Sequence, residues 1–152
     1  MGEAVTGDTV PDTDHVSRLF RNSQFDDNEL QPSAFVLSPN DDDGLSVNWL
    51  EHASTSHRTA LDAILAAART KRTVKPNERF AVMNVGRALE EAHNKCPELA
   101  IEHDPESPPR TDWTDETHSL IKNMTSGNNM AVAEILAEIA AVTHQIREFA
   151  TT

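Results

Sequence analysis

The chain is poor in cysteine, which stabilises secreted proteins as disulfides, and in basic residues, which bind nucleic acids. Its one cysteine, Cys96, excludes an internal disulfide and leaves no cysteine pair for a metal ion. Basic residues are also scarce: 13 stand against 25 acidic residues, and the formal net charge of −12 repels a phosphate backbone at long range. These shortages disfavour general nucleic-acid binding and fit a reducing compartment.

Long hydrophobic runs are absent as well. No stretch approaches the roughly 18 consecutive apolar residues of a membrane span. Residues 1–14 carry neither the basic nor the apolar region of a signal peptide. We therefore expect a cytoplasmic protein with no membrane contact.

What is present suffices for one globular core. With 152 residues, 38% of them hydrophobic, the chain has the usual size of a single domain. Residues 1–13 show no sustained apolar period, so we expect them to be a disordered tail. Residues 14–152 are then a single α+β domain. Its expected parts are one small mixed sheet with a β-hairpin, two short-to-medium helices, and a long C-terminal amphipathic helix packed on the sheet.

Strand signals recur along this domain. Two apolar runs, 34–37 and 45–50, flank a turn-rich segment at 39–44 and predict the hairpin. The run 80–85 is apolar almost throughout and bounded by turns, which is typical of a central strand buried on both faces. Shorter strands are predicted at residues 16–20, 99–101 and 120–121. A short helix over 87–95 precedes the strand at 99–101, so parallel pairing of that strand with 80–85 is open.

Two further helices have clear signals. Hydroxyl residues from Ser54 to Ser56 precede apolar residues at helical spacing, which predicts a helix over about 56–70 that ends before Pro76. The second helix, over about 128–150, has an unbroken apolar stripe made of Val132, Ile135, Ile139, Val142, Ile146 and Phe149. This stripe either packs on the chain's own sheet or forms an interface with a second copy of the chain.

A histidine and a carboxylate end one predicted strand, and another histidine stands beside the next. His103, Asp104 and His118 converge if those strands pair. A neutral imidazole oriented by a carboxylate can act as a general base, so these three are the candidate catalytic residues. The alternative is structural, with His103 and Asp104 ending a strand and His118 bonded to the loop. We expect no metal ion and no cofactor.

His15, His52 and His57 are each followed two residues later by Ser or Thr, which is similar to the paired motif of two-histidine phosphoesterases. That chemistry needs each histidine on a strand. His57 is expected to begin a helix, and His52 to lie in the turn before it. We therefore reject this assignment.

An otherwise acidic chain carries five cations within eleven residues, namely Arg69, Lys71, Arg72, Lys75 and Arg79. They are candidate binding residues for something anionic, such as a phosphate-bearing ligand, a nucleic acid strand or an acidic protein. Aromatic residues do not alternate with these cations, which weakens the single-strand interpretation. Neutralisation by the chain's own Asp and Glu is the alternative.

Four short stretches together resemble a group of small uncharacterised prokaryotic α+β proteins that share an ordered pattern. In this chain they are Ser33-Ala34-Phe35, Gly44-Leu45-Ser46-Val47, His103-Asp104-Pro105 and His118-Ser119-Leu120-Ile121. The resemblance spans residues 14–121 and implies a shared fold. It also implies that Ser33, Phe35, His103, Asp104 and His118 lie in a common region, and that the long C-terminal helix is an addition.

Three functions stay open. The first is a cytosolic protein-binding or accessory module of a prokaryotic conflict or defence system, which binds a protein partner or a second copy through the basic segment or the C-terminal helix. The second is a small hydrolase or nucleotide-acting enzyme that uses His103, Asp104 and His118. The third is nucleic-acid docking through residues 69–79. We favour the first and lean against an enzyme, because the sequence contains no complete catalytic set.

Overall fold

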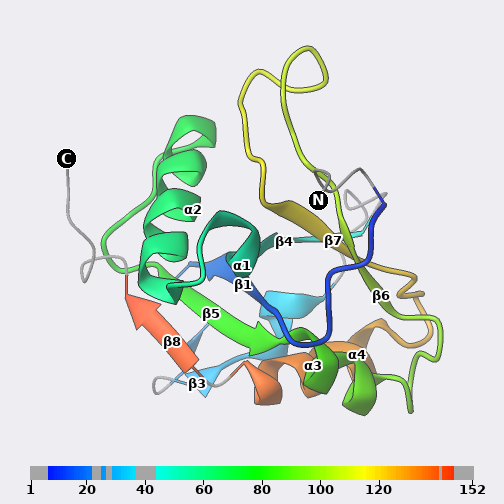
Figure 1. Cartoon of the computed structure of the whole chain (residues 1–152). Helices are drawn as coiled ribbons and strands as arrows, with labels where there is room; N and C mark the ends of the chain where they lie inside the picture. The colour runs from blue at the N-terminus through cyan, green and yellow to red at the C-terminus, as the bar shows by residue number, and fades with distance from the viewer. Residues whose placement is uncertain (1–6, 22–24, 27–28, 37–43, 141, 146–152) are drawn as a thin grey trace.

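The computed structural model describes residues 7–21, 25–26, 29–36, 44–140 and 142–145. Within these residues, six strands form one antiparallel sheet in the order β6-β7-β4-β1-β5-β8, and two short strands form a separate ribbon (Figure 1). The main sheet consists of β1 His15–Phe20, β4 Leu45–Trp49, β5 Arg79–Asn84, β6 Ala100–His103, β7 His118–Lys122 and β8 Val142–Gln145. The ribbon pairs β2 Phe25–Asp26 with β3 Glu29–Leu30.

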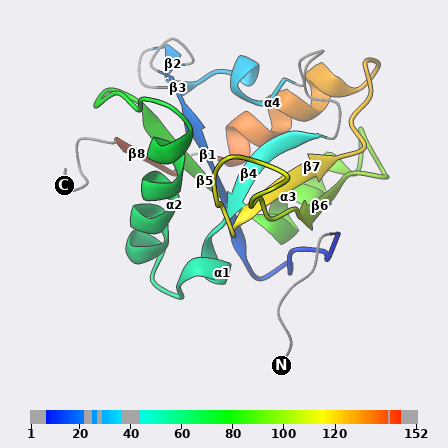
Figure 2. The same ribbon diagram turned by 90° about the horizontal axis from the view of Figure 1, so that it is seen from above.

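Helices lie on both faces of the main sheet (Figures 1 and 2). One face carries α2 (His57–Lys71), preceded by the short α1 (Leu50–Ala53). The other carries α3 (Val85–Ala92) and α4 (Asn129–Ile139), with the 3-10 helix η2 (Pro32–Phe35) packed against α4. The predicted α+β class is confirmed.

β5 separates two apolar clusters. Ala81 and Met83 belong to the larger cluster, which α3, α4 and η2 cover, whereas Phe80 and Val82 belong to a smaller cluster under α2. All four side chains are buried. This alternation confirms the predicted strand with two buried faces.

α2 agrees with its sequence signals. The Oγ of Ser56 accepts a hydrogen bond from the backbone N–H of Thr59 at 3.4 Å, which caps the first turn. The helix ends at Lys71, before Pro76, as expected. Its buried residues, among them Leu61, pack onto the sheet from one stripe of the helix.

The predicted hairpin is wrong in its first arm. Ala34 and Phe35 belong to η2, because Pro32 in its first turn favours helical φ and Phe35 packs edge-to-face on Phe20, with ring centroids 5.2 Å apart. The second arm is β4, but its partners are β1 and β7. Most of the turn expected at 39–44 lies outside the described residues.

The predicted mixed sheet is also wrong, since every described strand pair is antiparallel. β5 and β6 are not neighbours, because β1, β4 and β7 lie between them. β1 and β8 pair with the two edges of β5, so neither edge is open to a parallel partner. The segment from β5 to β6 therefore crosses the sheet.

The C-terminal helix is shorter than predicted. α4 ends at Ile139, Ala140 leaves the helical conformation with φ −77° and ψ 53°, and β8 then pairs with β5. The β-branched Val142 and Thr143 favour a strand, and their backbone groups pair along the edge of β5. The last two stripe residues, Ile146 and Phe149, lie outside the described residues. In the described part of the chain, no helix combines the length and apolar character needed to cross a membrane.

Residues 7–10, predicted to belong to a disordered tail, pair with β6. The backbone N–H of His103 donates to the carbonyl of Asp8 at 2.7 Å, and that of Val10 donates to the carbonyl of Ile101 at 3.0 Å. Val10 is completely buried. The tail prediction is wrong here because the edge of β6 supplies backbone partners that composition does not show. Residues 1–6 of the predicted tail lie outside the described residues.

Candidate functional site

Strand alternation gives β4 an apolar side and a polar side. Leu45 and Val47 enter the larger apolar cluster, whereas Ser46 and Asn48 point to the opposite face of the sheet. His118, the first residue of β7, is the register partner of Asn48. A polar group therefore forms on the sheet face that lies away from α4.

Asp104 and His118 meet where β6 ends and β7 begins. The backbone N–H of Asp104 donates to the carbonyl of His118 at 2.8 Å. In return, Nδ1 of His118 lies 2.8 Å from the carbonyl oxygen of Asp104 and 3.3 Å from its Oδ2. On the other side of the ring, Nε2 lies 3.0 Å from Oγ of Ser46. These contacts link Asp104, His118 and Ser46 in that order.

The hydrogen bonds fix the tautomer of His118. A carbonyl oxygen can only accept, so its contact with Asp104 places a proton on Nδ1. The neutral ring then has its lone pair on Nε2, where it accepts a hydrogen bond from the Ser46 hydroxyl. This is the state in which an imidazole can remove a proton from a serine.

The base and the carboxylate are buried, and the hydroxyl is accessible. The side chains of His118 and Asp104 are 7% and 11% exposed, whereas Ser46 is an exposed residue. Arg110 Nη2 donates to Oδ2 of Asp104 at 2.8 Å and so holds the carboxylate in place. The arrangement suits proton transfer in a largely dry environment and attack by a hydroxyl that a substrate can reach.

An ion cluster borders this group. Nζ of Lys71, the last residue of α2, lies 2.8 Å from Oε1 of Glu106 and 2.6 Å from Oδ2 of Asp115. Nδ2 of Asn48 lies 3.0 Å from both carboxylate oxygens of Asp115. Oε2 of Glu106 is 3.9 Å from Nε2 of His118. The cluster ties α2 to the sheet and sets a negative charge beside the imidazole.

Two pKa shifts accompany the cluster. Burial alone would lower the pKa of Lys71, but hydrogen bonds and charge from Asp115 and Glu106 raise it above 10.5. Burial alone would raise the pKa of Glu106, but hydrogen bonds from Lys71 and Trp113 lower it below 4.5. Both groups are therefore charged at neutral pH.

His103 is not part of this line of contacts. Its register partner is Ser119, and neighbouring strand positions face opposite sides, so its ring lies on the other face from that of His118. Its Nε2 donates to the carbonyl of Glu116 at 2.6 Å, and its Nδ1 has no hydrogen-bond partner among the described residues. The ring lies 4.7 Å from that of His52, and both line a cleft of about 270 Å³. Two of the three predicted catalytic residues therefore meet, and the third does not join them.

Ser46 is the residue that the sequence-based site missed. Its alternation with Leu45 and Val47 places it on the polar side of a strand, which was a usable signal. What the sequence did not supply was the pairing of β4 with β7, since Ser46 and His118 are 72 positions apart.

The basic segment is partly neutralised from within the chain. Lys71 binds Asp115 and Glu106, and Nη2 of Arg72 lies 2.7 Å from Oε1 of Glu78, whose side chain is only 3% exposed. For these two cations the structure supports the alternative of internal neutralisation. Arg69 and Lys75 are exposed, and Arg79 is half-buried.

The apolar stripe of α4 belongs to the chain's own core where it is described. Val132 and Ile139 are buried in the larger cluster, and Ile135 packs against it half-buried. α4 contacts η2 and α3 in this cluster. The first half of the stripe is thus covered within the subunit. The side chain of Val142 lies outside the described part of the structure.

No protein-family model matches the chain, and no curated protein or solved structure matches it significantly.

Proposed function

We propose that the chain is a small hydrolase of acyl esters or amides, with Ser46 as nucleophile, His118 as general base and Asp104 as the group that orients the imidazole. The observation that carries this proposal is the 3.0 Å contact between Oγ of Ser46 and Nε2 of His118, whose Nδ1 is bound by Asp104. A serine hydroxyl is a weak nucleophile until an adjacent base removes its proton. The proposal develops the second function that the sequence leaves open, a small hydrolase, and substitutes Ser46 for His103.

The chemistry takes two steps. Oγ of Ser46 forms a bond to the substrate carbonyl carbon while Nε2 of His118 takes the hydroxyl proton. His118 then donates this proton to the leaving alcohol or amine as the bond between that group and the carbonyl carbon breaks. Water next attacks the acyl-serine and gives one proton to Nε2, which returns it to the departing Oγ of Ser46. Asp104 stabilises the imidazolium that forms in each step.

The competing hypothesis of a binding or accessory module has less support. The described half of the α4 stripe is buried, and Lys71 and Arg72 bind carboxylates of the chain itself. A protein partner, a second copy of the chain, a nucleic acid at residues 69–79, a role in prokaryotic defence and a cytoplasmic location all stay predictions.

Labelling with a fluorophosphonate tests the proposal, because these reagents phosphonylate a serine that a neighbouring base activates. The full-length protein is incubated with the reagent, and the modified peptide is identified by mass spectrometry. We expect an adduct on Ser46 that is absent from Ser46→Ala. The variant His118→Gln is expected to react at least about a hundredfold more slowly, since it lacks the general base.

Ser126→Ala is the matched control, because Ser126 is an exposed serine in the turn before α4. This variant should be labelled at the wild-type rate, and circular dichroism should show that every variant is folded. A folded wild-type protein without an adduct on Ser46 contradicts the proposal. So does an adduct that forms equally fast in His118→Gln, and the contacts of Ser46 and His118 are then structural.

A further inference from the structure

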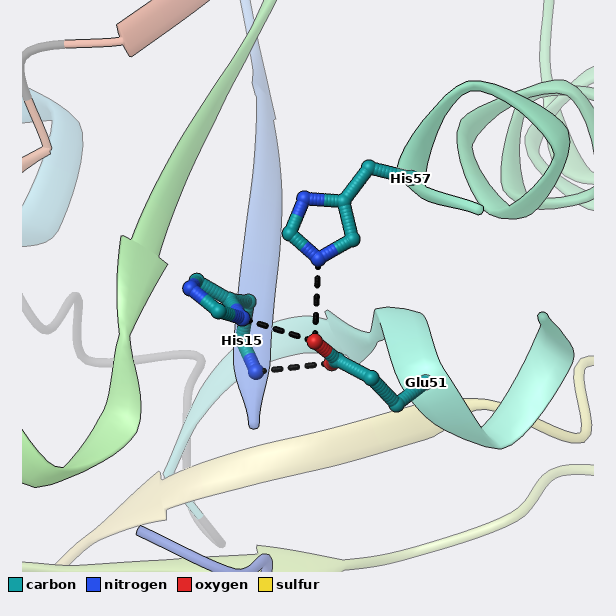
Figure 3. A group of neighbouring side chains, drawn as sticks. All are labelled: His15, Glu51 and His57. Carbon is teal, nitrogen blue, oxygen red and sulfur yellow. Dashed lines mark hydrogen bonds and ion pairs between the residues drawn. The ribbon is translucent and has the colours of Figure 1, made fainter. Parts of the chain in front are cut away.

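Three side chains from three different elements converge where β1 begins (Figure 3). Nδ1 of His15 lies 2.7 Å from Oε2 of Glu51, and Nε2 of His57 lies 2.9 Å from the same oxygen. The two rings meet edge-to-face, with centroids 4.5 Å apart. One carboxylate oxygen thus contacts a nitrogen of each imidazole. None of these residues belongs to the Ser46 site.

The turn between α1 and α2 brings Glu51 and His57 together. Oγ of Ser54 accepts the backbone N–H of Ser56 at 3.1 Å, and Ser56 then caps α2. Because the chain reverses here, two side chains six positions apart face each other across the turn. His15 reaches them from β1, where its backbone N–H donates to Oε1 of Glu51 at 2.8 Å and fixes the carboxylate.

Two imidazoles and one carboxylate are a ligand set that zinc prefers. Each residue offers one ligand atom, and the three atoms lie within 4.8 Å of one another. Ligands of a tetrahedral zinc ion, with bonds of about 2.0–2.1 Å, lie about 3.3 Å apart. To reach that spacing, each imidazole nitrogen needs to move about half an ångström away from Oε2 of Glu51, and any excess in the distance between the two nitrogens, now at most 4.8 Å, needs to close. Side-chain rotation at a partly exposed site can supply this movement.

The surroundings also fit a metal ligand set. Burial alone would raise the pKa of Glu51, but hydrogen bonds from His57 and His15 lower it below 4.5, so the carboxylate is ionised at neutral pH. The side chains of His15, Glu51 and His57 are 31%, 20% and 40% exposed. The group therefore faces solvent on one side, where water can supply a fourth ligand.

We propose that His15, Glu51 and His57 bind one divalent transition-metal ion, with zinc as the preferred ion, and leave one coordination position open to solvent. The ion replaces the two N–H protons that now point at Glu51, and each neutral ring carries its proton on the other nitrogen. Magnesium and calcium bind more weakly here, because they prefer oxygen ligands. Bound metal links β1 to the α1–α2 turn and thereby stabilises the fold.

Zinc binding to the full-length, tag-free protein tests this proposal. The protein is treated with a chelator, dialysed, and titrated with zinc chloride in a calorimeter, with magnesium chloride as the comparison ion. We expect one zinc per chain, little heat from magnesium, and a higher unfolding temperature with zinc. Glu51→Gln keeps the shape of the side chain and is expected to weaken zinc binding at least about tenfold.

His93→Gln is the matched control, because His93 bonds the carbonyl of Leu99 at 3.0 Å and lies outside the cluster. This variant should bind zinc as the wild-type protein does, whereas His15→Ala and His57→Ala should not. Cobalt(II) added to the wild-type protein gives an independent readout, since ligation by nitrogen and oxygen changes its visible spectrum. The proposal is overturned if the wild-type protein shows no saturable zinc uptake. It is also overturned if Glu51→Gln leaves zinc uptake unchanged while His93→Gln reduces it.

Discussion

Nζ of Lys71 lies 2.6 Å from Oδ2 of Asp115, and this ion pair joins the end of α2 to the segment just before β7. The Asp115 side chain is 4% exposed, so its charge has little contact with water. Asn48 of β4 binds the same carboxylate. The position of His118, three residues further along the chain, therefore depends on a contact with a helix on the face of the sheet that carries the polar group.

Replacing Lys71 with methionine keeps the apolar stem and removes the charge. Two carboxylates, those of Asp115 and Glu106, then lose their cation. Breaking a fully buried pair costs about 3–5 kcal/mol, and because Lys71 is partly exposed we expect the free energy of unfolding to fall by about 2 kcal/mol. Urea denaturation measures this change.

Arg58→Ala is the control for this variant. Arg58 and Asp62 are both 54% exposed and lie 3.9 Å apart, so their pair is screened by water. We expect a change below about 0.5 kcal/mol in the free energy of unfolding. Equal effects of the two substitutions would contradict a structural role for Lys71.

Acid should weaken the fold through Glu78. Burial alone would raise the pKa of Glu78, but Arg72 and the backbone N–H of Lys75 lower it below 4.5 in the folded state. The unfolded chain then binds a proton more readily than the folded one, so this stability is present above about pH 4.5 and is lost as the pH falls through the folded pKa. Unfolding free energies from neutral pH to about pH 3 should fall more steeply for the wild-type protein than for Glu78→Gln. Parallel curves would contradict the assignment.

Gly44 precedes β4 in a backbone conformation that few other residues adopt. Its φ is +136°, and a Cβ there would come 2.7 Å from the carbonyl oxygen of Ile121. We expect Gly44→Ala to destabilise the fold by about 1–3 kcal/mol in urea denaturation. Gly127→Ala is the control, because its Cβ would meet nothing closer than 3.8 Å. A Gly44→Ala protein as stable as the control would contradict the close approach of β4 to β7.

Val10 tests the packing of the N-terminal segment on β6. Its side chain is completely buried although it lies in a stretch with no apolar period. We expect Val10→Ala to lower the free energy of unfolding by about 2 kcal/mol, through lost burial and the cavity left behind. The exposed Thr13, changed to alanine, should shift it by less than about 0.5 kcal/mol. No loss of stability in Val10→Ala would mean that the segment is not packed.

Local sequence patterns predicted the helices and strands that are specified by their own residues. The period of α2 and the capping Ser56 define that helix, and the apolar run of β5 indicates a strand with two buried faces. The end of α4 could not be predicted in this way, because Val132 to Phe149 keeps a helical spacing throughout. What ends the helix is the edge of β5, where Val142 finds a backbone partner.

The candidate site was predictable only in part, and for the same reason. His103 and His118 stood out by residue type, but strand alternation sends their rings to opposite faces once the register is known. Ser46 joins His118 through the pairing of β4 with β7, which no local pattern specifies. The two-histidine phosphoesterase assignment is rejected because His57 begins a helix and His52 precedes it. Those local positions do not show that His57 meets His15 around Glu51.

The central claim is that Ser46 acts as a nucleophile. The most direct test is to react the chain briefly with p-nitrophenyl acetate, quench it in acid and measure its mass. The account predicts an acetyl group on Ser46 and a burst of about one equivalent of p-nitrophenol per chain in the first turnover. The variant Ser46→Ala should show neither the acetyl group nor the burst. A folded wild-type protein that carries no acetyl group on Ser46, or a Ser46→Ala protein with the same burst, would contradict it.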